Sequence, residues 1–159
     1  MCRYFSRQYS QAIEQLQKAT ELNPLFVSAH EVLAFAYARN GMSSAAVAQA
    51  QETFALLGGD SRGKAARARL SALIGNQDEA RKVLHELEQE SRPTHSPYGV
   101  QFAMIHVLLG QRNEALDWLE KALQGRSGAL IYLASDPEFQ DLHGDPRFDA
   151  LLRRIGLTA

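Results

Sequence analysis

Small and apolar residues recur along this chain with a period of 34 or 35 residues. Four alanines mark the period, and successive alanines lie 34, 34 and 35 residues apart: Ala12, Ala46, Ala80 and Ala115. Small or apolar residues also stand four and seven positions after each alanine, which places all three on one face of an α-helix. The pattern therefore predicts a series of similar helices, each with a narrow face that packs closely on a neighbour.

A second helical pattern precedes each of the later alanines, and a glycine separates the two. The glycines stand five residues before their alanines, at Gly41, Gly75 and Gly110. Helix-face spacings occur upstream of the first and the last of them, in the sets Leu33, Ala34, Tyr37 and Phe102, Ala103, His106. We expect each glycine to end a helix in the left-handed conformation, so that two helices form a hairpin.

These residues, at this period, resemble the tetratricopeptide repeat over residues 4 to 124. Pro24 matches the proline that closes such a repeat, whereas Arg67 and Ser71 replace a large apolar residue and a tyrosine. We therefore expect either a distorted first helix or a partly polar core in the third unit. The resemblance implies an all-α fold, a right-handed α-solenoid of helical hairpins with a C-terminal capping helix.

The repeat register divides the chain into five parts of one domain, residues 1–159. They are a half repeat at 1–24, repeats at 27–58, 61–92 and 96–126, and a cap at 127–159. Residues 1–21 have the pattern of a second helix without its first helix. Either upstream repeats have been removed, or the protein begins with a half-unit.

The cap differs from the repeats in its pattern. Asp136 and Asp145 each precede a proline, which predicts two helix N-caps with proline at the first helical position. An apolar stripe follows, and we expect it to cover the last hairpin: Phe148, Leu151, Leu152 and Ile155. Residues 96–157 resemble the C-terminal repeats of bacterial multidomain regulators.

The composition excludes some classes of function but does not identify one. The net charge of −1 gives no field that would attract nucleic acid or an anionic membrane, and no apolar stretch approaches the length of a membrane span. Cys2 is the single cysteine, which fits a reducing compartment, although a periplasmic protein without disulfides would look the same. We expect a soluble, cytoplasmic protein.

The resemblance implies that first helices line a concave groove. In that register the groove-facing residues are Glu31, Phe35, Arg39, Arg62, Arg69, Val100 and Met104. They make a groove that is cationic in the middle and apolar toward its C-terminal side, suited to an extended acidic and apolar peptide. The alternative is a solvated charged face, which charge runs usually are.

The other motifs in the sequence do not indicate a phosphate-binding, metal-binding or catalytic site. The segment from Gly58 to Lys64 is close to a phosphate-binding loop, but Ala65 follows where serine or threonine is needed, so we expect a turn between repeats. No histidine spacing suits a metal, no cofactor is expected, and His106 is predicted to be a hydrogen-bonded core histidine. Cys2 has no catalytic partners in view.

The sequence thus predicts a module or scaffold that binds a peptide or protein partner in the concave groove. The resemblance of its C-terminal repeats implies that it is the C-terminal part of a larger bacterial regulator. The alternative is a self-association element that forms a weak homodimer through Phe5, Tyr9 and Ile13. An enzyme is the third possibility and is disfavoured, because no acid, base and nucleophile converge. Direct contact with nucleic acid or a membrane is not expected.

Overall fold

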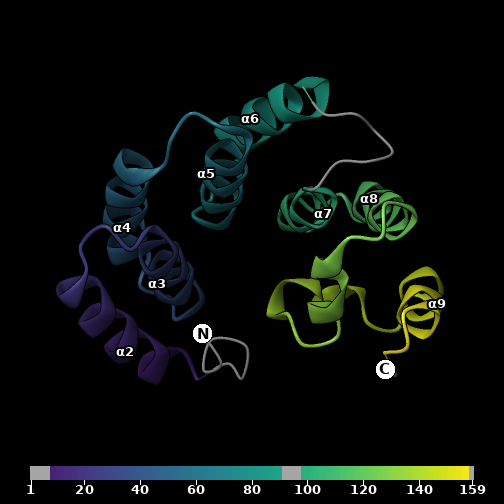
Figure 1. The fold of residues 1–159 in the computed structure, drawn as a ribbon, viewed down its shortest axis with the longest axis horizontal. Coiled ribbons are helices and arrows are strands. Elements are labelled where there is room, and N and C mark those ends of the chain that lie inside the picture. The colour runs from purple at the N-terminus through teal and green to yellow at the C-terminus, as the bar shows by residue number, and fades with distance from the viewer. Residues whose placement is uncertain (1–7, 91–97, 158–159) are drawn as a thin grey trace. The chain divides into compact units, whose positions relative to one another are not determined.

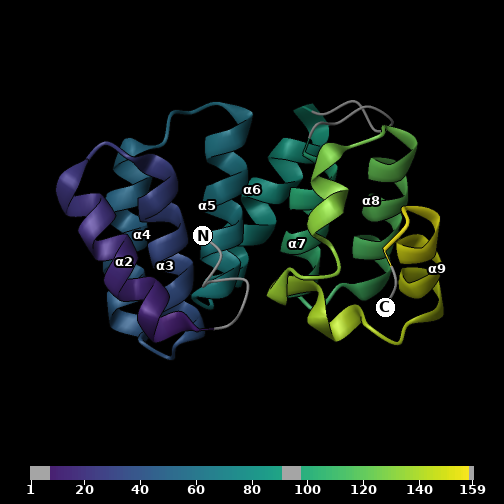
Figure 2. The same cartoon turned by 60° about the horizontal axis from the view of Figure 1, so that its bottom comes forward.

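The computed structural model describes residues 8–90 and 98–157, and every regular element in these ranges is a helix (Figures 1 and 2). The elements are α2 (Tyr9–Leu22), α3 (Val27–Arg39), α4 (Ser43–Leu56), α5 (Ser61–Leu73), α6 (Gln77–Glu90), α7 (Gly99–Leu108), α8 (Arg112–Gln124), the 3₁₀ helices η1 (Gly128–Tyr132) and η2 (Pro137–Leu142), and α9 (Pro146–Arg154). The all-α prediction is confirmed. None of the helices described is long and apolar enough to cross a membrane.

The chain forms two compact units, Met1–Ala80 and Arg81–Ala159, and α6 begins in the first and ends in the second. In the first unit α3 packs on α2, on α4 and on α5. The division of the chain into repeats and a cap stays a prediction.

The hairpin turns have the predicted backbone. Gly41, Gly75 and Gly110 have φ angles of 76°, 86° and 75°, in the left-handed region where a side chain costs free energy. Each glycine lies two residues after the last residue of one helix and two residues before the first residue of the next. The prediction that glycine ends the first helix of each hairpin is therefore confirmed.

The four period-marking alanines are buried as expected. Ala12 is 4% exposed, and Ala46, Ala80 and Ala115 are fully buried. In the hairpins α3–α4 and α7–α8, the alanine lies on the helix that packs closely on its partner. A methyl group at these positions lets the helix axes approach, which is the reason for the small residue in the pattern.

A histidine ties the first hairpin to the turn before it. His30 donates from Nε2 to the carbonyl oxygen of Pro24 at 2.9 Å. Its Nδ1 accepts from Nε2 of Gln49 on α4 at 2.8 Å, and both side chains are buried. These two bonds satisfy both ring nitrogens of a neutral imidazole, so a polar pair is accommodated inside the hairpin.

Helix α5, the first helix of the predicted repeat at residues 61–92, is not distorted by its polar residues. Helix α5 is a regular α-helix of 13 residues, and Ser71 is buried in place of a larger side chain. Arg67 points outward, where its guanidinium lies 2.6 Å from Glu79 and 5.5 Å from the centre of the Phe54 ring. Of the two outcomes expected from the sequence, the structure shows the partly polar core.

The segment that the sequence predicts to be a cap has the two predicted N-caps. Asp136 accepts from the backbone N–H of Glu138, and Asp145 accepts from the backbone N–H of Arg147 at 2.9 Å. The N–H of Arg147, assisted by Arg112, holds the pKa of the Asp145 carboxyl below its ordinary value. Both capped helices carry proline in their first turn.

The apolar stripe of α9 is largely buried against the second unit. Phe148, Leu151 and Leu152 are at most 1% exposed, while Ile155 follows the end of the helix and is half-buried. Two ion pairs, Arg147–Asp117 and Arg154–Glu120, join α9 to α8 at the surface. Exposed pairs of this kind contribute little to stability, so we attribute most of the packing energy of α9 to its buried apolar stripe.

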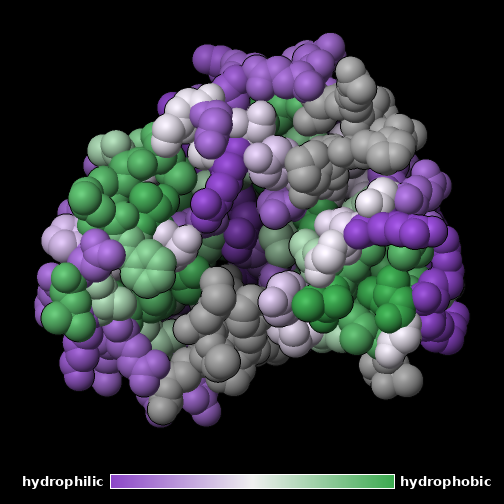
Figure 3. All heavy atoms as spheres, viewed as in Figure 1, coloured by the Kyte–Doolittle hydropathy of each residue, from purple (hydrophilic) through white to green (hydrophobic). Residues whose placement is uncertain are grey.

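Large apolar side chains remain exposed at the connection between α2 and α3. Leu22 is 88% exposed, Leu25 75% and Phe26 49%. Figure 3 shows apolar side chains, in green, gathered over the first unit. Exposed apolar clusters often mark a binding surface.

Candidate functional site

The candidate site lies on the first unit, where α3 and α5 pack side by side. Glu31, Phe35 and Arg39 are spaced four residues apart on α3, so they follow one another along one face of that helix. Arg62 and Arg69 are spaced seven apart on α5 and share a face in the same way. We name these five residues the α3–α5 face.

Three of the residues form one cluster. The Arg69 guanidinium carbon lies 3.7 Å from the centre of the Phe35 ring, and its Nη1 lies 3.5 Å from Oε1 of Glu31. Phe35 itself is buried, so it supports Arg69 and offers little surface to a ligand. The stacked, paired arginine is held in a defined orientation on the face.

Among the described residues, neither Arg62 nor Arg39 pairs with a carboxylate. Nη2 of Arg62 donates to the hydroxyl of Ser28 on α3 at 3.2 Å, and Arg62 is exposed. Nε of Arg39 is buried without a hydrogen-bond partner. A guanidinium has five donor hydrogens, so both side chains retain donors for a carboxylate.

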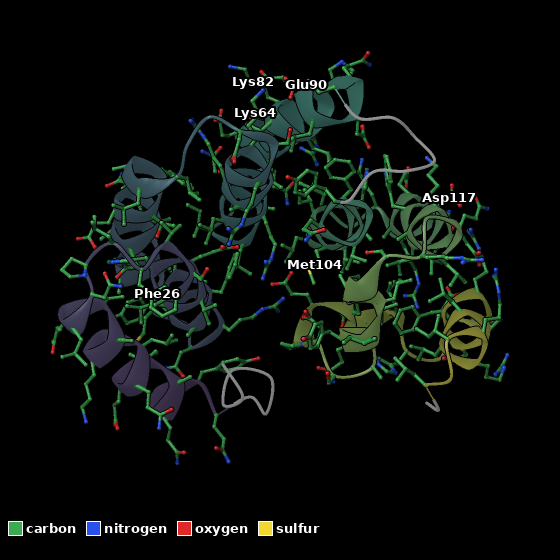
Figure 4. The ribbon with its side chains drawn as sticks, in the orientation of Figure 1. Phe26, Lys64, Lys82, Glu90, Met104 and Asp117 are labelled. Atoms are coloured by element: carbon green, nitrogen blue, oxygen red, sulfur yellow. The ribbon has the colours of Figure 1, made fainter. Side chains whose placement is uncertain are left out.

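Two other cations of α5 do not join the face in the same way. Arg67 turns toward α4 and α6, as described above, because it is two residues from Arg69 and so projects from a different side of the helix. Lys64 is half-buried near the start of α5 (Figure 4). The charge run of α5 is therefore spread around the helix rather than gathered into one patch.

The apolar residues assigned to the groove from the fourth repeat lie in the second unit. Val100 and Met104 are on α7, where they are 2% and 8% exposed. Met104 is labelled in Figure 4. Their place in a groove together with the α3–α5 face stays a prediction.

The residues assigned to self-association lie at and before the start of α2. Phe5 is outside the described residues. Ile13 is buried and Tyr9 half-buried, and both pack into the core that α2 forms with α3. In the folded first unit Ile13 is thus largely covered by the chain itself, and a homodimer through this helix stays a prediction.

The phosphate-loop-like segment is a turn, as expected. It joins α4 to α5, and Asp60 caps α5 by accepting from the backbone N–H of Gly63 at 2.8 Å. A Cβ on Gly63 would lie 2.1 Å from the carbonyl oxygen of Gly58, so the glycine serves the close turn. Within the described ranges no group of three His, Cys, Asp or Glu side chains could hold a metal ion; Cys2 lies outside those ranges.

A buried polar cluster in the second unit was missed by the sequence analysis except for His106. Oε1 of Glu88 on α6 accepts from Nε1 of Trp118 at 3.0 Å and lies 3.1 Å from Nε2 of His106. Nδ1 of His106 lies 2.9 Å from Oε1 of Gln111, so the prediction of a hydrogen-bonded core histidine is confirmed. The hydrogen bond from His106, with that from Trp118, holds the pKa of Glu88 below its ordinary value.

The Glu88 cluster gives no sign of a catalytic site. The carboxylate is engaged by the ring nitrogens of His106 and Trp118, and Lys121 lies 4.1 Å from the centre of the Trp118 ring. All of these groups are used in joining α6, α7 and α8. We therefore interpret the cluster as structural.

The fold belongs to the class of proteins built from helical hairpins, and the α3–α5 face exposes charged side chains. One comparison with known proteins makes this class more specific. A family model described as TPR repeat matches residues 4–41, which include α2 and α3. The match supports a tetratricopeptide repeat protein and covers less than half of the chain. No curated protein and no solved structure matches the chain.

Tetratricopeptide repeats generally mediate protein–protein interaction or scaffolding, and folds of this type are typically non-catalytic.

Proposed function

We propose that this chain is a protein-interaction module, and that the α3–α5 face binds an acidic, partly apolar peptide. The observation that supports this most is that two of the three arginines on this face have no carboxylate partner among the described residues. Glu31 pairs with Arg69, whereas Arg62 donates to the neutral hydroxyl of Ser28 and Nε of Arg39 has no hydrogen-bond partner. The face thus carries more positive than negative side chains, although the whole chain has a net charge of −1.

A peptide carboxylate at Arg62 would replace a neutral hydrogen bond with a charge-assisted one. Such bonds are shorter and about twice as strong as neutral ones, so the exchange favours the ligand. Arg69 is already neutralised by Glu31 and stacked on Phe35, so in this proposal it guides the peptide rather than holding a carboxylate. We therefore assign the main contacts to Arg62 and Arg39.

The proposal keeps Val100 and Met104 in the groove by the repeat register; because both are buried, they would support its apolar side rather than contact the peptide directly. It also takes the chain to be one domain of repeats and a cap, residues 1–159, acting in the cytoplasm. The resemblance of residues 96–157 to the C-terminal repeats of bacterial multidomain regulators supports a role as the sensory part of such a regulator. The single cysteine favours a reducing compartment.

A peptide titration tests the proposal. A fluorescein-labelled peptide of alternating glutamate and leucine is titrated with the full chain and followed by fluorescence anisotropy. We expect Arg62→Glu to weaken binding at least about tenfold, since it replaces an attraction with a repulsion. Added salt should also weaken binding, because the contacting charges are near the surface.

Two controls make the titration decisive. Arg153→Glu changes the same charge on the exposed side of α9 and should leave binding unchanged. A peptide with glutamine in place of glutamate should bind weakly. Equal binding of both peptides, or an equal effect of the two arginine changes, would place the partner elsewhere. Sedimentation of the same samples over a concentration series tests the alternative, a homodimer through Phe5, Tyr9 and Ile13.

A further inference from the structure

An apolar cleft lies between α2 and α3 of the first unit, with a volume of about 210 Å³. One wall comes from α2 and consists of Ala12, Gln15, Leu16 and Ala19. The other comes from α3 and from the residue before it, and consists of Phe26, Ser28, Ala29 and Val32. Phe26 is labelled in Figure 4. Leu22 and Leu25, in the same connection between α2 and α3, are exposed.

The wall on α2 has counterparts in the repeat that follows. Thirty-four residues on, its four positions are occupied by Ala46, Gln49, Ala50 and Thr53 of α4. All four are at most 9% exposed, and α4 packs on α3. In α2, by contrast, Gln15 is exposed and Leu16 and Ala19 are half-exposed. The repeat thus leaves open on α2 a face that it covers on α4.

The equivalent helix face in the second unit is also covered, which is an independent observation. The same four positions on α8 are Ala115, Trp118, Leu119 and Ala122, which are at most 7% exposed. Their helix packs on α7, the first helix of its own hairpin. In both hairpins where the pairing is described, a first helix covers this face.

The wall on α3 fits the same interpretation. Val32, which is half-exposed in the cleft, corresponds to Ala66 of α5, which is 6% exposed, and α5 packs on α3. Helix α3 therefore contacts both its own second helix and the next first helix. A helix placed against α2 and α3 as α3 is placed against α4 and α5 would fill the cleft.

We propose that this cleft binds an amphipathic helix of about four turns from another polypeptide, in the place that a repeat's first helix takes. The chemistry of α3 defines the occupant: a large apolar residue followed by alanine, as in Leu33 and Ala34, both at most 2% exposed. A hydrogen-bonding side chain three positions before the apolar residue would meet Gln15, as His30 meets Gln49 at 2.8 Å.

A second copy of this chain is a poor source of that helix. In α3 and α7 the corresponding apolar faces are already buried in their own hairpins: Leu33, Ala34, Phe102 and Ala103 are at most 2% exposed. The cap helix α9 likewise buries its stripe on the second unit. Among the described helices, none of these offers a free face of the required pattern, so the proposal assigns the helix to a different polypeptide.

The chain supplies a suitable probe in its own sequence. A labelled synthetic peptide, Val27–Arg39, has the residues of a first helix, and its binding to the full chain is measured by fluorescence anisotropy. We expect saturable binding by this peptide and none by a scrambled peptide of the same composition. Replacing the peptide's histidine with alanine should weaken binding severalfold, because Gln15 then loses its partner.

Variants of the cleft locate the binding. Ala19→Glu and Gln15→Lys both place a charge on the α2 wall at positions that are not fully buried, and each should reduce affinity at least about tenfold. Lys18→Glu changes an exposed residue of α2 outside the cleft lining and should leave affinity unchanged. Circular dichroism of each variant shows whether the fold is retained, and Gln15→Lys serves if Ala19→Glu unfolds.

The outcomes separate the proposal from its alternatives. No saturable binding, equal binding of the scrambled peptide, or full binding by both cleft variants would overturn it. A concentration-dependent dimer that Ala19→Glu abolishes would also overturn it, since a second copy would then occupy the cleft. Arg39→Gln changes no residue of the cleft lining and should leave binding of the Val27–Arg39 peptide unchanged, whereas it should weaken binding of the acidic peptide. The two proposals can therefore fail independently of each other.

Discussion

Removing the carboxylate of Glu88 should destabilise the second unit, because this side chain joins three helices. Its Oε1 faces the ring N–H groups of both Trp118 and His106, which are 7% and 6% exposed. In Glu88→Ala both nitrogens lose that partner inside the unit. A buried donor left without a partner costs about 1–3 kcal/mol.

The partial exposure of the Glu88 side chain limits the total loss of stability. Its side chain is 31% exposed, so water can enter the space left by the carboxylate and bind part of the freed donors. We therefore expect a loss of about 1–3 kcal/mol for the whole change rather than for each donor. A loss of about 2 kcal/mol corresponds to a fall in Tm of about 4–8 °C for a chain of this size.

Differential scanning calorimetry of three proteins tests the magnitude. Glu86→Ala is the matched control, since Glu86 is an exposed residue of the same helix and should change stability by less than about 0.5 kcal/mol. Glu88→Gln keeps an acceptor oxygen and should fall between the parent and Glu88→Ala. If Glu88→Ala melts with the control, the cluster does not stabilise the unit.

The pH dependence of the unfolding free energy provides a second, independent test of the same contact. The hydrogen bond from His106 is the largest cause that lowers the pKa of Glu88 from the ordinary value of 4.5. A lowered pKa in the folded state adds stability above pH 4.5, and that stability is lost as the pH falls through the folded value. The stability difference between the parent and Glu88→Gln should therefore shrink as the pH is lowered below about 4.5. A difference that stays constant down to pH 3 would contradict this assignment.

Two further changes test the packing of the hairpins and of the cap. Ala46→Leu should overpack the crossing of α3 and α4 and cost about 1–3 kcal/mol in urea unfolding, whereas Ala48→Leu on the exposed side of α4 should be nearly neutral; equal midpoints would mean that the crossing is not tight. Deleting residues 145–159 removes the buried stripe of α9 and should cause concentration-dependent aggregation in light scattering, and a truncated chain that stays monomeric and equally stable would show that α9 is not a cap.

Positions with a fixed backbone or volume requirement were predictable from the sequence. Gly41 and its equivalents take a left-handed φ that other residues rarely adopt, and Ala46 fills a crossing that has room for one methyl group. Asp145 before proline is similarly constrained by the first turn of a helix. Each of these requirements is local, so a residue type at a fixed offset is enough to reveal it.

Contacts between side chains distant in sequence were not predictable in the same way. Arg67 and Arg69 look equivalent in the sequence, yet one pairs with Glu79 and the other with Glu31, because they project from different sides of α5. Glu88 was missed because its partners are 18 and 30 residues away, and neither separation is a multiple of the repeat. The cleft between α2 and α3 was predictable only in part. The residues of its α2 wall follow the repeat pattern, and they differ from their counterparts in α4 in being left uncovered.

The hydrogen bonds of His30 have a spectroscopic consequence. With Nε2 donating to Pro24 and Nδ1 accepting from Gln49, the imidazole is held as a single neutral tautomer. The two tautomers of histidine differ widely in the ¹⁵N chemical shifts of their ring nitrogens, so this one ring carries a distinct NMR signal of its own. Because its partners lie on the preceding turn and on α4, that signal reports the intact α3–α4 hairpin without any attached label.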